Sequence, residues 1–143
     1  MSKITLLQSY DSPILLENHS EGWVYRISDK YVVKVPSPVE LEKYTTHMFY
    51  EIKIARLLYS FGISVPEPIT CDYVNVRDKV EIGYIMEYID GITNERSSHS
   101  QVLDEVNKAN ELGFTNTDTG WIFIPKDKEI KLIDFTKWNY KGL

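Results

Sequence analysis

Short runs in which apolar and polar residues alternate fill the first half of the chain, and this period-two pattern predicts β-strands. Turn-forming residues separate the first three runs, which predict an antiparallel meander over residues 14–18, 23–27 and 31–35. Two later runs, about residues 69–76 and 80–88, predict two more strands joined by a turn at residues 77–79. The first half therefore predicts five strands of a mostly antiparallel sheet.

Apolar residues recur at helical spacing in two segments, and a glycine follows each segment. The first helix is expected over about residues 40–61, with an apolar face made of Met48, Ile52, Ala55 and Leu58. The second is expected over residues 101–112, with an apolar face made of Val102, Leu103, Val106, Ala109 and Leu112. Gly62 and Gly113 are the expected C-terminal caps, because glycine adopts the left-handed conformation that ends many helices.

The rest of the second half predicts a loop and a hairpin. Residues 92–100 are polar and predict a loop, whereas residues 121–124 and 129–135 predict two strands that turn at residues 125–128. The order of three strands, helix, two strands, helix and two strands predicts an α+β domain with a mostly antiparallel sheet.

Composition and charge narrow the class of protein. The 143 residues are 43% hydrophobic and 26% charged, which is typical of one soluble globular domain. The net charge of −5 argues against nucleic acid as the main partner. The lone Cys71 cannot form a disulfide within the chain and is interpreted as a small strand residue, with a nucleophile as the alternative. Since no signal peptide and no apolar run of about 20 residues is found, we expect a cytoplasmic protein without membrane contact.

A lysine and a glutamate occupy positions at which the pattern expects apolar residues. Lys34 lies in a β-branched strand and shares a face with Val32, although a solvent-facing lysine at a sheet edge is the alternative. Glu51 lies on the apolar face of the first helix, where a buried carboxylate is costly unless it has a partner. A helix packed on the preceding sheet would bring Glu51 to Lys34, whereas a carboxylate at the margin of the apolar face would reach water.

Asp134 lies between Ile133 and Phe135, at the end of the last apolar run. Oxygen ligands at a strand end suit Mg²⁺, which usually takes one or two carboxylates together with phosphate oxygens. An aspartate that caps a turn is the alternative.

These segments resemble, in order along the chain, parts of the protein-kinase fold. Residues 21–27 resemble its nucleotide loop, and residues 31–35 resemble its lysine strand. Residues 85–91 resemble its hinge, and residues 130–135 resemble the strand that leads to its metal-binding aspartate. Residues 57–69 are similar to the segment after the first helix in smaller members, such as RIO-type kinases, lipopolysaccharide kinases and aminoglycoside phosphotransferases. The resemblance covers about residues 14–136.

The resemblance implies a single minimal kinase-like domain with two lobes. Its N-lobe, about residues 1–89, would be a five-stranded antiparallel sheet with one helix. Its C-lobe, about residues 90–143, would be reduced to one helix and a hairpin. Since the sequence ends nine residues after Asp134, no activation segment and no large helical lobe are expected.

The resemblance also implies a role for each matched residue, with ATP and Mg²⁺ as cofactors. Lys34 would contact the α- and β-phosphates and pair with Glu51, and Asp134 would bind Mg²⁺. The residues expected around the nucleotide are Ser20, Gly22, Val24, Lys34, Met86, Glu87 and Ile89. Ser20 and Gly22 would lie over the phosphates. Met86 would stand beside the adenine, whose edge would hydrogen-bond to the backbones of Glu87 and Ile89.

The catalytic loop departs from the family pattern, which has a histidine, an aspartate base and, further along, an asparagine. Counted back from Asp134, these three positions fall on Gly113, Thr115 and Gly120, and none of them matches. Asp118 as base and Asn116 as metal ligand are the expected substitutes from the same loop, with a plain turn as the alternative.

Three hypotheses follow from these residues. An atypical kinase-fold protein would bind ATP and keep a phosphotransferase or ATPase activity, with Asp118 as base. A pseudokinase would act through a protein partner without catalysis, as the altered loop and the short second lobe favour. An unrelated α+β domain is the third hypothesis. The aromatic tail, residues 135–140, is expected to fold back over the second lobe, with a partner-binding surface as the alternative.

Overall fold

The computed structural model describes residues 8–9, 13–18, 22–37 and 41–142 of the 143-residue chain. The chain forms two compact units. The first unit comprises Met1–Ile52 and Pro68–Tyr88, and the second comprises Lys53–Glu67 and Ile89–Leu143. Each unit has its own β-structure and its own buried side chains.

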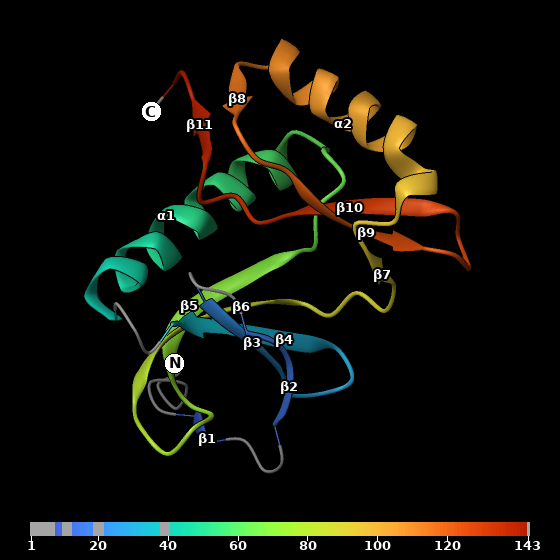
Figure 1. The fold of residues 1–143 in the computed structure, drawn as a ribbon. Coiled ribbons are helices and arrows are strands. Elements are labelled where there is room, and N and C mark those ends of the chain that lie inside the picture. The colour runs from blue at the N-terminus through green and yellow to red at the C-terminus, as the bar shows by residue number, and fades with distance from the viewer. Residues whose placement is uncertain (1–7, 10–12, 19–21, 38–40, 143) are drawn as a thin grey trace. The chain divides into compact units, whose positions relative to one another are not determined.

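The first unit is built on a six-stranded sheet with the strand order β1-β5-β6-β4-β3-β2 (Figure 1). The strands are β1 (Gln8–Ser9), β2 (Ile14–Asn18), β3 (Gly22–Arg26), β4 (Tyr31–Pro36), β5 (Pro68–Asn75) and β6 (Glu81–Glu87). The strands β2 to β6 pair in antiparallel fashion, which confirms the predicted five-stranded sheet. The strand β1, which pairs with β5 in parallel, was not predicted from the sequence.

One face of this sheet carries an apolar core. Alternate side chains along the strands form it together with Val76, which follows β5; the strand residues are Tyr25, Val33, Val35, Val74 and Ile85. Gly83 belongs to the same face, because a Cβ atom at this position would lie 2.5 Å from Val33 Cγ2. Residues one position away along these strands, such as Lys34 and Met86, therefore face the other side of the sheet.

Helix α1 covers Leu41–Ser60, close to the predicted residues 40–61, of which residue 40 lies outside the described residues. The predicted apolar face is confirmed, because Met48, Ile52, Ala55 and Leu58 are all buried. Gly62 follows the helix with φ = 81°, and the Ile63 N–H donates to the Leu58 carbonyl at 3.0 Å. Gly62 is therefore the C-terminal cap that the sequence predicted. The part of α1 up to Ile52 belongs to the first unit.

The second unit contains helix α2 (His99–Glu111), which begins two residues earlier than predicted (Figure 1). The 3₁₀ turn η2 (Arg96–Ser98) leads into it, and the Ser97 N–H donates to the Glu95 carboxylate at 3.0 Å. Val102 and Ala109 are buried, but Leu103 and Leu112 are exposed, so the predicted apolar face was too wide. Neither α1 nor α2, the α-helices of the described residues, is long and apolar enough to span a membrane.

The predicted hairpin is present in the second unit as β9 (Gly120–Ile124) and β10 (Glu129–Ile133). β10 ends before Asp134, so the prediction that this strand continues to residue 135 was wrong. A short strand β7 (Ile92–Thr93) pairs with β9. The prediction of a loop over residues 92–100 was therefore wrong as well, because β7, η2 and the start of α2 occupy that segment.

The aromatic tail folds back within the second unit, as predicted. Strand β11 (Trp138–Tyr140) pairs in antiparallel fashion with β8 (Phe114–Asn116), a strand that the sequence analysis took for a loop. The Trp138 ring lies 5.5 Å from the Phe135 ring and 6.4 Å from the Phe114 ring, centroid to centroid. Trp138 is only 1% exposed, so the alternative of a partner-binding tryptophan is wrong.

Candidate functional site

Four residues that were expected around a nucleotide share one face of the sheet in the first unit. Lys34 of β4 lies opposite Val24 of β3, and Val32 lies opposite Met86 of β6. Directly opposite residues share a face, and alternate residues of one strand return to it. Gly22, Val24, Lys34 and Met86 therefore lie on the side of the sheet that faces away from the apolar core.

The ion pair that the sequence predicted is present on this face. The Lys34 ammonium donates to Glu51 Oε1 of α1 at 2.8 Å. Lys34 is 4% exposed and Glu51 is 2% exposed. A solvent-facing lysine and a carboxylate at the margin of the helix, which were the alternatives, are therefore both wrong. The two charges neutralise each other in surroundings from which water is almost excluded.

A second contact joins the same turn of α1 to the sheet. The Cys71 thiol donates to the Met48 carbonyl at 3.7 Å, and Cys71 lies opposite Tyr84 in the sheet. Tyr84 in turn lies opposite Lys34 and is 1% exposed, so it belongs to the same face. Tyr84 was not predicted as a site residue, although its spacing of two residues from Met86 places the two side chains on one face of the strand. The packing of Cys71 agrees with its interpretation as a strand residue.

Of the two residues expected over the phosphates, Gly22 is among the described residues. Gly22 is buried and begins β3, where it lies opposite Pro36. Ser20 lies outside the described residues. The contact of either residue with a phosphate stays a prediction.

The residues expected along the adenine edge lie at the end of β6 and just after it. Met86 and Glu87 are its last two residues, and Ile89 follows; all three are half-buried. The Tyr88 N–H donates to the Lys30 carbonyl at 2.7 Å, which fixes the backbone between Glu87 and Ile89. The proposed hydrogen bonds to adenine stay predictions.

Asp134 stands immediately after β10 in the second unit, with an exposed side chain and φ = 63°. A Cβ atom at Gly120, which lies opposite Ile133, would come within 2.8 Å of Asp134 Oδ2. The carboxylate therefore lies close to the backbone of β9. Among the residues that the structure describes, no group of three or more His, Cys, Asp or Glu side chains gathers into a metal site. A Mg²⁺ ion that is held by one or two carboxylates plus phosphate does not need such a group. The role of Asp134 as its ligand stays a prediction.

The left-handed backbone of Asp134 leads to a stability prediction. Aspartate, asparagine and glycine adopt this conformation readily, whereas alanine pays about 1–2 kcal/mol. We expect Asp134→Ala to lower the free energy of unfolding by about 1 kcal/mol, and Asp134→Asn to lower it much less. Denaturant titration of both variants measures the difference. Equal losses for the two substitutions would contradict the strain argument. Asp134→Asn is therefore the better variant for removing the charge alone.

The residues predicted as a metal ligand and as a base, Asn116 and Asp118, lie at the end of β8 and in the turn after it. Asn116 is the last residue of β8 and lies opposite Trp138. Its side-chain amide donates to the Thr119 hydroxyl, so this side chain already has a partner within the turn. Asp118 is exposed in the same turn. The structure brings Asn116 and Asp118 into one turn, as a plain turn would also do, and their catalytic roles stay predictions.

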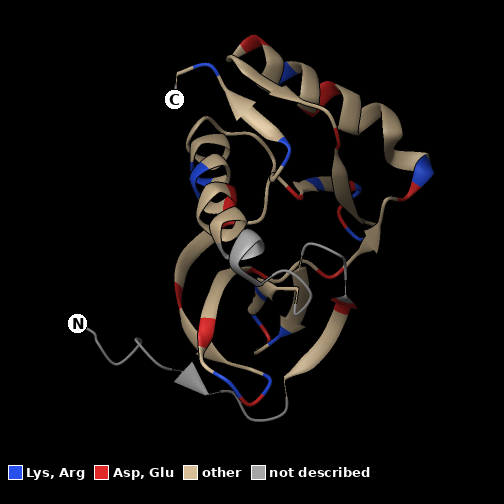
Figure 2. Cartoon of the chain, turned by 60° about the vertical axis from the view of Figure 1, so that its left-hand side comes forward, with Lys and Arg blue, Asp and Glu red and all other residues tan. Residues whose placement is uncertain are grey.

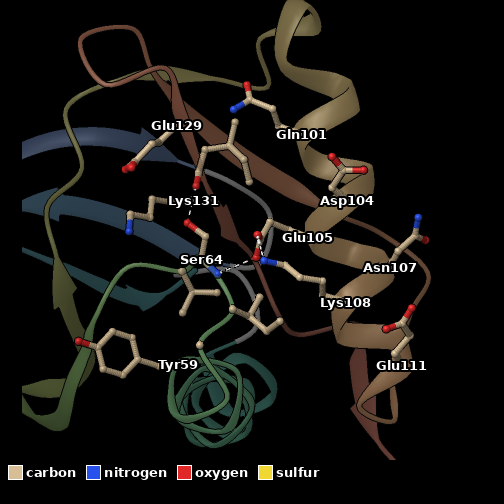
Figure 3. Close-up of a pocket in the computed structure, with 14 residues that line it drawn as sticks. Tyr59, Ser64, Gln101, Asp104, Glu105, Asn107, Lys108, Glu111, Glu129 and Lys131 are labelled. Carbon is tan, nitrogen blue, oxygen red and sulfur yellow. Dashed lines mark hydrogen bonds and ion pairs between the residues drawn. The ribbon is translucent and has the colours of Figure 1, made fainter.

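A groove of about 1030 Å³ opens elsewhere in the second unit, between α2, the loop after α1 and β10 (Figure 3). Within it, Glu105 accepts from the Ser64 N–H at 3.0 Å and pairs with Lys108 at 2.6 Å. The hydrogen bond to Glu105 raises the pKa of Lys108. The acidic residues of α2 are seen in red in Figure 2. None of the predicted site residues lines this groove, and charges of this kind are ordinary on a solvated helix face.

Comparisons with known proteins find similarity among solved structures. No family model matches the chain, and no curated protein matches it. Among solved structures, the chain is similar to the crystal structure of the ADP-bound aminoglycoside phosphotransferase APH(2'')-Ib, with 23% sequence identity and a TM-score of 0.46. The match covers 76% of this chain but 37% of that chain, so this chain spans well under half of that protein.

Proposed function

We propose that this chain is a small kinase-like protein that binds ATP with Mg²⁺, and that the sheet face with Lys34 holds the nucleotide. The observation that supports this most is the buried ion pair between Lys34 and Glu51, at 2.8 Å. In this proposal Lys34 donates to the α- and β-phosphates, and Glu51 fixes the direction of its ammonium group.

The ion pair is difficult to explain by stability alone. Removing two charges from water offsets most of their attraction, so an apolar pair in the same space often stabilises a protein equally well. A phosphate site, by contrast, needs a compact cation at a fixed position, and lysine supplies one. Its attraction for phosphate is also stronger where water is excluded than at an exposed surface.

The neighbours of Lys34 suit a nucleotide. Val24 and Met86 offer apolar surface on the same face, which is what the flat rings of a base require. The backbone after β6 is held in place by the Tyr88–Lys30 hydrogen bond, and Glu87 and Ile89 are the proposed partners of the adenine edge. Asp134 is proposed separately, as a Mg²⁺ ligand of the second unit.

Thermal unfolding with and without ATP and Mg²⁺ tests the proposal. At an ATP concentration about a hundredfold above its Kd, the wild type is expected to gain about 2.7 kcal/mol, which raises its Tm by several degrees. The double substitution Lys34→Met, Glu51→Leu replaces the ion pair by apolar side chains and should abolish the rise. Lys79→Ala, which removes an exposed lysine of the same unit, should keep it. A wild type whose Tm does not respond to ATP and Mg²⁺ would overturn the proposal.

A second candidate is a binding module of the same fold that does not catalyse transfer. The pairing of β8 with β11 and the hydrogen bond from Asn116 to Thr119 favour it, because they occupy the loop in which the substitutes for catalytic residues lie. Release of phosphate from ATP separates the two candidates. Turnover that Asp118→Asn abolishes would support phosphotransfer, whereas ATP binding without turnover would support the second candidate.

A further inference from the structure

We infer that Gly22 is a positioning residue for Lys34: its missing side chain leaves the space in which the lysine stem lies when the ammonium group reaches Glu51. From the sequence, Gly22 was expected only to lie over the phosphates. The inference concerns the geometry of the ion pair, and only its consequence for ATP affinity rests on the proposed function.

The distances around Gly22 carry this inference. A Cβ atom at Gly22 would lie 3.0 Å from Lys34 Cε, 3.2 Å from Lys34 Cγ and 3.0 Å from the Val35 carbonyl oxygen. Non-bonded carbon atoms prefer separations of about 3.5–4.0 Å, so the two contacts with the lysine stem would be too short, and the contact with the Val35 oxygen would be tight as well. Two of the three atoms belong to the stem of the lysine that pairs with Glu51.

The backbone conformation does not explain the glycine. Among the glycines in the part of the chain that the structure describes, Gly62 and Gly113 have a positive φ, and Gly22 does not. Other residues can therefore adopt the backbone of Gly22. The requirement at this position is space, and the side chain that uses the space is that of Lys34.

A side chain at Gly22 would act mainly on Lys34. The Val35 carbonyl belongs to β4, whose backbone is held between β3 and β6, so it moves little. The lysine stem is flexible and is the part that yields. A shift of a few tenths of an ångström in the stem would lengthen the 2.8 Å bond to Glu51 Oε1 and change the direction of the ammonium group.

A matched control is available on the opposite face of the same sheet. A Cβ atom at Gly83 would lie 2.5 Å from Val33 Cγ2 and 2.8 Å from Val74 Cγ2, within the apolar core. Gly83→Ala therefore crowds the sheet without touching the stem of Lys34. A general loss of packing would change the surroundings of the Lys34 ammonium in both variants. A positioning role of Gly22 predicts that change in Gly22→Ala alone.

Two measurements without nucleotide test the inference. The first is the NMR resonance of the Lys34 ammonium in protein with isotope-labelled lysine, assigned by its absence in Lys34→Met. Gly22→Ala is expected to shift or broaden it, and Gly83→Ala to leave it in place. The second is a double-mutant cycle on the unfolding equilibrium constant. Gly22→Ala should raise that constant about tenfold in the wild type and much less with Lys34→Ala, Glu51→Leu, where the stem is gone and only the contact with the Val35 carbonyl remains.

The outcomes separate this inference from the proposed function. An unchanged Lys34 resonance in Gly22→Ala, or an equal effect of Gly22→Ala in both backgrounds, would overturn the positioning role. Where ATP binds the wild type, Gly22→Ala is also expected to weaken its affinity more than Gly83→Ala does. If ATP does not bind, the proposed function fails, and the resonance and the cycle still decide the role of Gly22.

Discussion

Replacement of Glu51 by alanine is expected to lower the free energy of unfolding by about 3–5 kcal/mol. The substitution leaves the Lys34 ammonium in surroundings where it is 4% exposed and has lost the carboxylate at 2.8 Å. Breaking a buried ion pair by removing one partner is much more costly than losing an exposed ion pair, which is worth about 0–1 kcal/mol.

Denaturant titration measures this effect, with two variants as controls. Lys53→Ala changes an exposed position two residues further along α1 and should change stability by about 0.5 kcal/mol or less. Lys34→Met, Glu51→Leu removes both charges and should recover most of the loss. A small effect of Glu51→Ala would contradict the expectation that the buried Lys34 ammonium depends on Glu51.

Replacement of Trp138 by alanine is expected to be about as costly, at about 3–5 kcal/mol. Trp138 is 1% exposed, and its ring contacts Phe135 and Phe114 in the second unit. The truncation removes a large apolar surface and leaves a cavity that the paired backbones of β8 and β11 keep from collapsing.

The matched control for this variant is Lys137→Ala, one residue earlier and exposed. It should unfold at nearly the same denaturant concentration as the wild type. If Trp138→Ala behaves like Lys137→Ala, the tail does not hold the second unit together, and the fold-back contributes little to stability.

The parts of the fold that the sequence predicted are those with strong local signals. Helix α1 has a long apolar face and ends at Gly62, and the strands β2 to β6 alternate over several residues each. The pairing of Lys34 with Glu51 could also be predicted from the sequence. Both charged residues occupy positions that become buried when the helix packs on the sheet, and a buried charge is costly unless it is paired.

The parts that the sequence did not predict are short or depend on distant residues. The strands β1 and β7 have two residues each, too few for a period-two pattern to show. The strands β8 and β11 pair across a long stretch of chain, and Trp138 provides the packing that holds them. The space that Gly22 leaves for Lys34 was also hidden, because it depends on how β3 lies against β4.

The measurement that tests the central claim most directly is the NMR resonance of the Lys34 ammonium during titration with ATP and Mg²⁺. The proposal that Lys34 contacts the phosphates predicts a saturable change in this resonance, with the exposed Lys79 ammonium unaffected as an internal reference. A Lys34 resonance that stays constant throughout the titration would contradict it, and the ion pair with Glu51 would then be a structural feature only.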